Sequence, residues 1–253
     1  MGKKSSIAWN QVCQNKFDGG LGIKNLGLFD VALNLSQFWN ICKKKHSGWV
    51  KLLHNYYFSN VNVWDMVEKN HYSWQVKKIL RLRSMAEKCV TVTQGGVLSW
   101  KGVDNCFQWK GSYDLLKGDI QEKLWAELVW ADLSPPKHNF CAWLAIQNKI
   151  QTRDRLVLEG DIDRRCCWCR HHPESHEHIF FKCSSMHVLK PLFDVAGSSI
   201  HWESWDDVME WRTQRIWKSK EEKEITSFII NAAIYEIWSN RNSTIFSNIK
   251  LLS

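Results

Sequence analysis

Apolar and polar residues alternate with helical spacing soon after the start of the chain. From residue 28, apolar side chains recur at steps of three and four, which places them on one face of a helix. They are Ala32, Leu35, Phe38, Trp39 and Cys42. The lysines at 43–45 mark the end of this helix, because cations suit the carboxyl end of a helix dipole. A second helix is expected over residues 49–57.

Residues 73–88 have an apolar side and a basic side, which again predicts a helix. The apolar side consists of Trp74, Val76, Ile79, Leu80, Leu82 and Met85. The basic side consists of Lys77, Lys78, Arg81 and Arg83. A solvated surface is the simpler interpretation of these cations, and a surface that contacts phosphates is the sharper one.

The spacing changes at Cys89, where apolar and polar residues begin to alternate. Together with four glycines between residues 95 and 111, this predicts short strands and turns up to Tyr113. Helical spacing returns over 119–129 and again after the break at Pro135–Pro136. Thr152 is the expected N-cap of a further helix that ends at Gly160.

Two more helices are expected in the last quarter of the chain. Ser204 is suited to cap the first, which has acidic residues in its first turn. The second covers residues 220–246 and is the longest helix predicted. Its apolar face is formed by Ile225, Phe228, Ile229, Ala232, Ala233 and Ile237.

Cysteine and histidine crowd into residues 166–183, which read CCWCRHHPESHEHIFFKC and hold four of the nine cysteines and four of the ten histidines. Cys166, Cys169, His178 and Cys183 follow the spacing C-x2-C-x8-H-x4-C. Three thiolates and one imidazole complete the tetrahedral coordination of a closed structural zinc site. The sequence therefore predicts one structural Zn²⁺ in preference to a redox-active cysteine pair.

The sequence constrains the identity of the metal more than the identity of its ligands. Cys167 is the alternative to Cys166, although a C-x-C pair strains a turn that C-x-x-C closes comfortably. His176 is the alternative to His178, and His171 or His172 can reach in from the loop. His178 is preferred because His-x4-Cys is the usual second half of a CCHC site.

The predicted fold is mainly α with a few short β-strands and a small CCHC zinc knuckle, an irregular α+β arrangement. Four segments are expected. Residues 1–60 form a helical segment, 61–118 a helix plus short strands, 119–195 the zinc-binding domain, and 196–253 the C-terminal helices.

The amino-acid composition limits the kinds of partner and the cellular compartment that we expect for this protein. The net charge of +8 and the pI near 9.0 favour acidic partners, nucleic acid first. Most of the sixteen tryptophans are expected to anchor helices in the core. The cysteines outside the cluster are scattered, which indicates a reducing compartment, the nucleus or cytoplasm. No signal peptide or membrane-spanning run is apparent, and no small-molecule substrate is expected.

Three segments together resemble one family. They are IAWNQVCQNKFDGGLGIKNL, then PPKHNFCAWLAIQNKIQTRDRLVLEGD with the cysteine–histidine stretch and its E-S-x-x-H-x-F-F-x-C ending, then YEIWSNRNSTIF. In the same order, they are similar to the region behind the polymerase domain, the zinc-binding domain and a downstream stretch of LINE-type (non-LTR) retrotransposon reverse transcriptases of plants. The resemblance implies that the chain is a C-terminal piece of such a polyprotein.

The chain departs from that family in its catalytic residues. Polymerase chemistry there needs a Tyr/Phe-x-Asp-Asp pair and a distant aspartate to hold two metal ions. The sequence contains no such motif, and Asp206–Asp207 is better explained as part of a helix cap. We therefore expect a chain that is not an enzyme, although the parent polyprotein would be an RNA-directed DNA polymerase.

Nucleic-acid binding is the function expected of the knuckle. The zinc would fix a basic turn so that Arg164, Arg165 and Arg170, with Lys182, face a phosphate backbone. Trp168 or His172 would stack on an unpaired base. RNA or DNA is the expected partner, together with the polymerase domain of the parent element. The alternatives are a zinc-stabilised protein–protein interaction module and a decayed retroelement remnant without activity.

Overall fold

The structure is a computed structural model that describes residues 7–58, 61–92, 98–100, 103–104, 106–118, 121–155, 163–184 and 203–250. It is mainly helical with one short sheet, which confirms the predicted fold class. The chain divides into two compact units, the first made of Met1–Leu21 and Glu122–Ser253, the second of Gly22–Gln121. The four-segment division expected above stays a prediction, and these two units cut across it.

In the second unit, the predicted helices at its start are confirmed. Helix α2 spans Leu26–Cys42 and α3 spans Gly48–Tyr56. The side chain of Asn25 accepts hydrogen bonds from the first backbone N–H groups of α2, and Ser47 does the same for α3. These caps satisfy amides that have no partner inside the helix. The apolar face of α2 enters a core that also contains Trp100.

The basic segment of this unit forms two helices, α4 over Trp74–Arg81 and α5 over Arg83–Glu87. Trp74 is exposed, so it does not belong to the buried side expected for it. The predicted phosphate-contacting cations have partners within the unit. Lys78 pairs with Asp30, Arg81 pairs with Glu68 at 2.7 Å, and Arg83 donates to the carbonyl of Met66.

The sheet of the second unit has the order β1-β2-β3 and is antiparallel. Its strands are Val90–Val92, Leu98–Trp100 and Val103–Asp104. The strands expected up to Tyr113 do not continue, because Trp109–Lys117 is helix α6. Ser112 of this helix is buried and accepts a hydrogen bond from the Trp100 indole at 2.8 Å. A polar residue therefore lies on the buried face of α6, which an alternating strand pattern would have placed in solvent.

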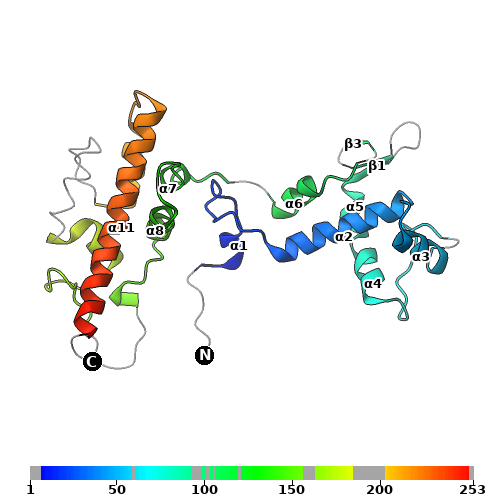
Figure 1. Cartoon of the computed structure of the whole chain (residues 1–253), viewed down its shortest axis with the longest axis horizontal. Helices are drawn as coiled ribbons and strands as arrows, with labels where there is room; N and C mark the ends of the chain where they lie inside the picture. The colour runs from blue at the N-terminus through cyan, green and yellow to red at the C-terminus, as the bar shows by residue number, and fades with distance from the viewer. Residues whose placement is uncertain are drawn as a thin grey trace. The chain divides into compact units, whose positions relative to one another are not determined.

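The first unit contains the elements that carry the cysteine–histidine stretch. They are α1 (Trp9–Val12), α7 (Ala126–Val129), α8 (Pro136–Ile146), a 3₁₀ turn (Arg153–Arg155), one π-helical turn (His178–Lys182), α10 (Trp205–Gln214) and α11 (Lys220–Lys250). Helix α11, orange to red in Figure 1, runs beside α7 and α8. No described helix is both long and apolar enough to cross a bilayer.

Several predictions for this unit hold and others need correction. Ser204 caps α10 in a reciprocal capping box with Asp207, as expected for that position. Helix α7 covers only the end of the helix predicted over 119–129. Thr152 precedes the 3₁₀ turn, and Gly160 lies outside the described residues.

The buried face of α11 differs from the predicted one. Ile225 and Phe228 are exposed, and the buried stripe is Ile230, Asn231, Ala233, Ile234 and Ile237. The amide nitrogen of Asn231 donates to the carbonyls of Leu128 and Val129 at 2.9 and 3.2 Å. These carbonyls lie at the end of α7, so a polar residue inside the stripe satisfies groups that a helix end leaves open.

The N-terminal segment docks on the same core through its glycine turn. The Trp143 indole on α8 donates to the carbonyl of Gly19 at 2.9 Å, and Ile7 is part of the core. Gly19 has φ 93°, a conformation that glycine adopts without strain. A Cβ at Gly20 would lie 2.1 Å from the carbonyl oxygen of Gln14. The predicted turn is therefore also a close packing contact.

The tryptophans are divided between core and surface. Trp39, Trp100 and Trp143 are fully buried, as expected of core anchors. Others lie at the surface of the described part of the chain: Trp9, Trp49, Trp74 and Trp109. Packing in the core therefore explains only some of the tryptophans in this chain.

Candidate metal centre

The first half of the centre is a tight turn that begins at Cys166. The backbone N–H of Cys166 donates to the carbonyl of His172 at 2.8 Å, and the N–H of Arg170 donates to the carbonyl of Cys166 at 3.0 Å. Arg170 has φ 55°, in the left-handed region. This closure folds the chain back on itself and lets Cys166 and Cys169 face one point.

The second half is formed by Ser175–Cys183. Ser175 Oγ accepts from the N–H of His178 at 3.2 Å, and Cys183 N–H donates to the carbonyl of His178 at 2.8 Å. Ile179 and Phe180 between them are buried in the core with residues of α8 and α11. The apolar side chains of this turn thus anchor it, and His178 and Cys183 face the first half.

Four donor atoms converge in the space between the two halves. The Sγ atoms of Cys166 and Cys183 are 3.7 Å apart, and Cys169 Sγ lies 3.3 Å from His178 Nε2. The donor atoms of all four residues lie within 4.8 Å of one another, and all four residues are buried. A tetrahedral zinc ion with bonds of ~2.3 Å to sulfur separates its thiolates by ~3.8 Å. A disulfide would bring two sulfurs to ~2.05 Å. The donor set and its spacing therefore fit one zinc ion.

The neighbouring residues considered as alternative ligands are not members of this group. Cys167 is half-buried and does not belong to this group of four. The ring of His176 packs against Phe180 and Trp205, with centroids 5.0 and 6.2 Å away. Burial lowers the pKa of His176 to about 4, so its imidazole is neutral near pH 7.

The turn also favours the charge state that a metal ligand requires. Hydrogen bonds from the Cys167 thiol and from the backbone N–H groups of Cys169 and Trp168 hold the pKa of the Cys166 thiol well below its usual value. Its thiolate is therefore favoured, and zinc is bound by thiolates rather than thiols.

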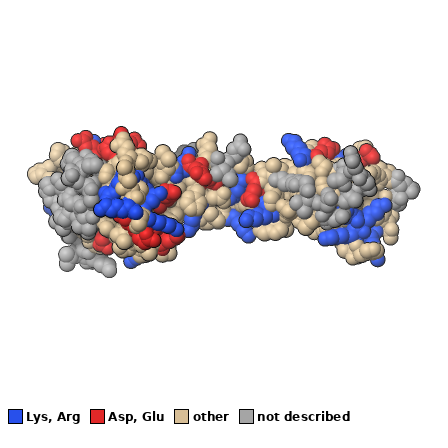
Figure 2. Space-filling view, turned by 90° about the horizontal axis from the view of Figure 1, so that it is seen from above, with Lys and Arg blue, Asp and Glu red and all other residues tan. Residues whose placement is uncertain are grey.

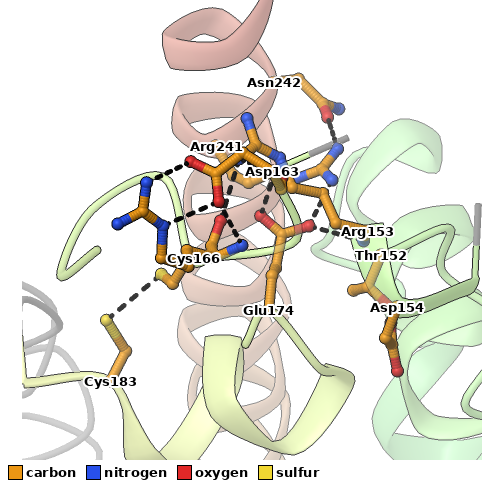
Figure 3. Close-up of polar contacts among 10 residues, drawn as sticks. Thr152, Arg153, Asp154, Asp163, Cys166, Glu174, Cys183, Arg241 and Asn242 are labelled. Carbon is orange, nitrogen blue, oxygen red and sulfur yellow. Dashed lines mark hydrogen bonds and ion pairs between the residues drawn. The ribbon is translucent and has the colours of Figure 1, made fainter. Parts of the chain in front are cut away.

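Sequence reasoning did not single out Glu174, which holds the knuckle to the rest of the unit (Figure 3). Its side chain is 0% exposed and forms an ion pair with Arg241 of α11, itself 6% exposed. Glu174 Oε1 also accepts from the N–H of Arg153 at 2.8 Å. The Arg153 guanidinium donates to the carbonyls of Asp163 and Arg165 at 3.1 and 2.9 Å. The only sequence signal was that Glu174 and Arg241 stand in two of the motifs quoted above.

The residues expected to contact nucleic acid have different surroundings. Arg164 and Arg170 are exposed, and neither has an ion-pair partner in the part of the chain that the structure describes. Arg165 is also exposed but pairs with Asp163 at 2.8 Å. Lys182 pairs with Glu177 at 2.8 Å, with both side chains exposed. Trp168 is half-buried and packs against the three cysteines.

Residues 107–189 match the family model described as zinc-binding in reverse transcriptase. A protein described as an uncharacterized mitochondrial protein of Arabidopsis thaliana is 30% identical over 94 residues, which cover 37% of this chain and 61% of that protein. No solved structure matches the chain. The matched stretch contains the four converging donors, so this part of the chain is a reverse-transcriptase zinc-binding domain.

Proposed function

We propose that this chain, which carries a reverse-transcriptase zinc-binding domain, is a non-catalytic, nucleic-acid-binding C-terminal region of a LINE-type retrotransposon polyprotein. The order of the three resembling segments supports the LINE type. The buried pair of Glu174 and Arg241 adds support, since it joins residues of the second and third segments.

The proposed zinc ligands are Cys166, Cys169, His178 and Cys183. Four protein ligands leave no position for water or a substrate, which is the arrangement of a structural rather than a catalytic zinc. The ion would hold the two halves of the knuckle together, since each half supplies two of the four ligands. The surrounding residues lower the pKa of the Cys166 thiol, which favours its thiolate, and they bury the four ligands away from water.

Nucleic-acid binding rests on one observation: two arginines that have no acidic partner among the described residues flank the turn that the zinc would fix. Arg164 precedes Cys166 by two residues, and Arg170 follows Cys169 directly. Their guanidinium groups suit phosphate oxygens, which accept paired hydrogen bonds. Arg165 and Lys182 would exchange their surface carboxylates for phosphates, because solvent-exposed ion pairs contribute little to stability.

The test is salt-dependent binding of single-stranded RNA and DNA to the full zinc-loaded chain. Arg164→Gln combined with Arg170→Gln is expected to weaken binding and to lower the slope of log K against log salt by ~0.7 per lost contact. The matched control is Lys51→Gln with Lys110→Gln, which removes the same charge from exposed positions of the second unit.

Two outcomes would contradict the proposal. Equal losses in the knuckle variant and the control would mean that only net charge matters. Unchanged affinity and salt slope in the knuckle variant would remove this surface from the function altogether.

A further inference from the structure

A cavity of about 580 Å³ lies in the first unit, where α10 ends and α11 begins. Residues 122–127 and Phe17 form its other walls. The cavity is remote from the knuckle. Lys223 in the cavity wall and Arg241, which pairs with Glu174 of the knuckle, are 18 positions apart on α11, or ~27 Å at 1.5 Å per residue. Figure 2 looks onto the end where α11 begins and shows cationic and acidic side chains side by side there.

Arg212 is the feature of this cavity that calls for a ligand. It lines the cavity although only 6% of it is exposed, and it has no ion-pair partner among the described residues. Its hydrogen bond runs from Nη1 to Ser227 Oγ at 2.9 Å. A guanidinium carries five N–H donors, so Nε and Nη2 remain available. The carboxylates of Glu127 and Glu224 act on the Arg212 guanidinium only at longer range, and burial lowers its pKa despite them. A buried cation without a directly paired carboxylate is costly, and an anion in the cavity would offset that cost.

The remaining charges of the wall favour an anion as well. Four cationic residues line the cavity, Lys123, Arg212, Arg215 and Lys223, against the two acids Glu122 and Glu127. Glu127 is neutralised by Lys223, with 2.5 Å between their charged atoms. Arg215 pairs with Glu222 at 2.9 Å, which leaves the cations Lys123 and Arg212 against one acid of the wall, Glu122. Lys123 is exposed.

The cavity also has an aromatic wall. The Phe17 side chain is 57% exposed, and no described aromatic ring stacks on it. Trp217 is held in place by the guanidinium groups of Arg212 and Arg215, 5.5 and 5.0 Å from its ring centroid. Phe17 is therefore the ring that a planar ligand can cover. Base stacking on such a ring tolerates any base.

We propose that this cavity binds one nucleotide unit of a nucleic-acid strand, with its phosphate on Arg212 and Lys123 and its base against Phe17. This proposal deepens the nucleic-acid-binding function proposed above and adds a second contact at the other end of α11. The two contacts are too far apart for a mononucleotide to reach both.

The experiment measures binding of adenosine 5′-monophosphate, inorganic phosphate and adenosine to the full zinc-loaded chain by calorimetry. The nucleotide is expected to bind more tightly than either part alone. Arg212→Met, which keeps an apolar stem and removes the guanidinium, is expected to weaken nucleotide binding at least ~10-fold. Phe17→Leu is expected to weaken nucleotide binding several-fold and to leave phosphate binding unchanged. Phe246→Leu is the control, since Phe246 is exposed on α11 outside the cavity.

The knuckle double variant of Arg164 and Arg170 separates the two proposals, because it should leave binding of the mononucleotide unchanged. If Arg212→Met does not fold, Lys123→Gln at the exposed rim replaces it, with a loss of several-fold expected. Absence of nucleotide binding would overturn the cavity proposal, and so would equal affinities in the wild type, Phe17→Leu and Lys123→Gln. Neither result would bear on the knuckle.

Discussion

The carboxylate of Glu174 in the zinc knuckle and the guanidinium of Arg241 in α11 form a buried ion pair across 67 positions of sequence. Arg241 lies far beyond residue 189, where the match to the zinc-binding family ends. The knuckle is therefore built into a larger folding unit, and α11 is part of its support.

Breaking this ion pair should be costly. Glu174→Gln leaves Arg241 charged, buried and without its counter-ion, so we expect the free energy of unfolding to fall by ~3–5 kcal/mol. Glu177→Gln removes a carboxylate from the exposed pair with Lys182 and should cost far less, because solvent screens that pair. Chemical denaturation at saturating zinc measures both. Equal effects of the two substitutions would mean that the buried pair does not hold the knuckle.

The identity of the histidine ligand can be read from zinc content. His178→Ala should release zinc or weaken its binding strongly, because three thiolates alone do not complete the site. His176→Ala should retain one zinc per chain and lose stability through the cavity it leaves beside Phe180 and Trp205. Metal analysis after gel filtration gives the stoichiometry. Full retention of zinc by His178→Ala would refute the assigned ligand.

The glycine turn of the N-terminal segment should tolerate no side chain at Gly20. A Cβ there meets the carbonyl oxygen of Gln14 at 2.1 Å, so Gly20→Ala must displace backbone and should destabilise the first unit by ~2 kcal/mol or more. Gly48 lies in the first turn of α3, where an added Cβ meets nothing within 4 Å. Gly48→Ala should be neutral or stabilise by up to ~1 kcal/mol, as seen in thermal unfolding.

Thiol labelling should separate the cysteines by burial. Burial raises the pKa of Cys141 to about 12, so at pH 8 its thiolate fraction is ~10⁻⁴ and alkylation should be slow. Cys106 is exposed and should react first, as peptide mass spectrometry would reveal. Chelation of zinc should then expose Cys166, Cys169 and Cys183 to the reagent. Rapid labelling of Cys141 in the native protein would contradict its burial.

The raised pKa of Cys141 also predicts that the protein loses stability at high pH. Above the ordinary thiol pKa of ~8.5, Cys141 ionises in the unfolded chain while the folded chain keeps its proton. The stabilising contribution is complete below that pH and declines as pH rises toward 12. Cys141→Ala should flatten this decline, which denaturation at pH 7, 9 and 10 can measure.

Local patterns were sufficient where a residue's role depends on its neighbours in sequence. The spacing of Cys166, Cys169, His178 and Cys183 predicted the group that converges, because a turn and a short helix position each pair from within. Caps such as Ser204 and helices such as α2 follow from the same local rules. The alternation of apolar and polar residues wrongly predicted strands where α6 forms. Ser112 of this helix is buried and accepts a hydrogen bond from Trp100, a contact that sequence spacing does not reveal.

The sequence alone thus predicted which cysteine and histidine side chains converge, the mainly helical fold and the basic character of the knuckle, all of which depend on short-range chemistry. Only the tertiary structure decided which face of α11 is buried, that Glu174 meets Arg241, and that Arg212 lines a cavity with no directly paired carboxylate among the described residues. Those features depend on packing between segments far apart in the chain, and a buried charge is informative only once its surroundings are known.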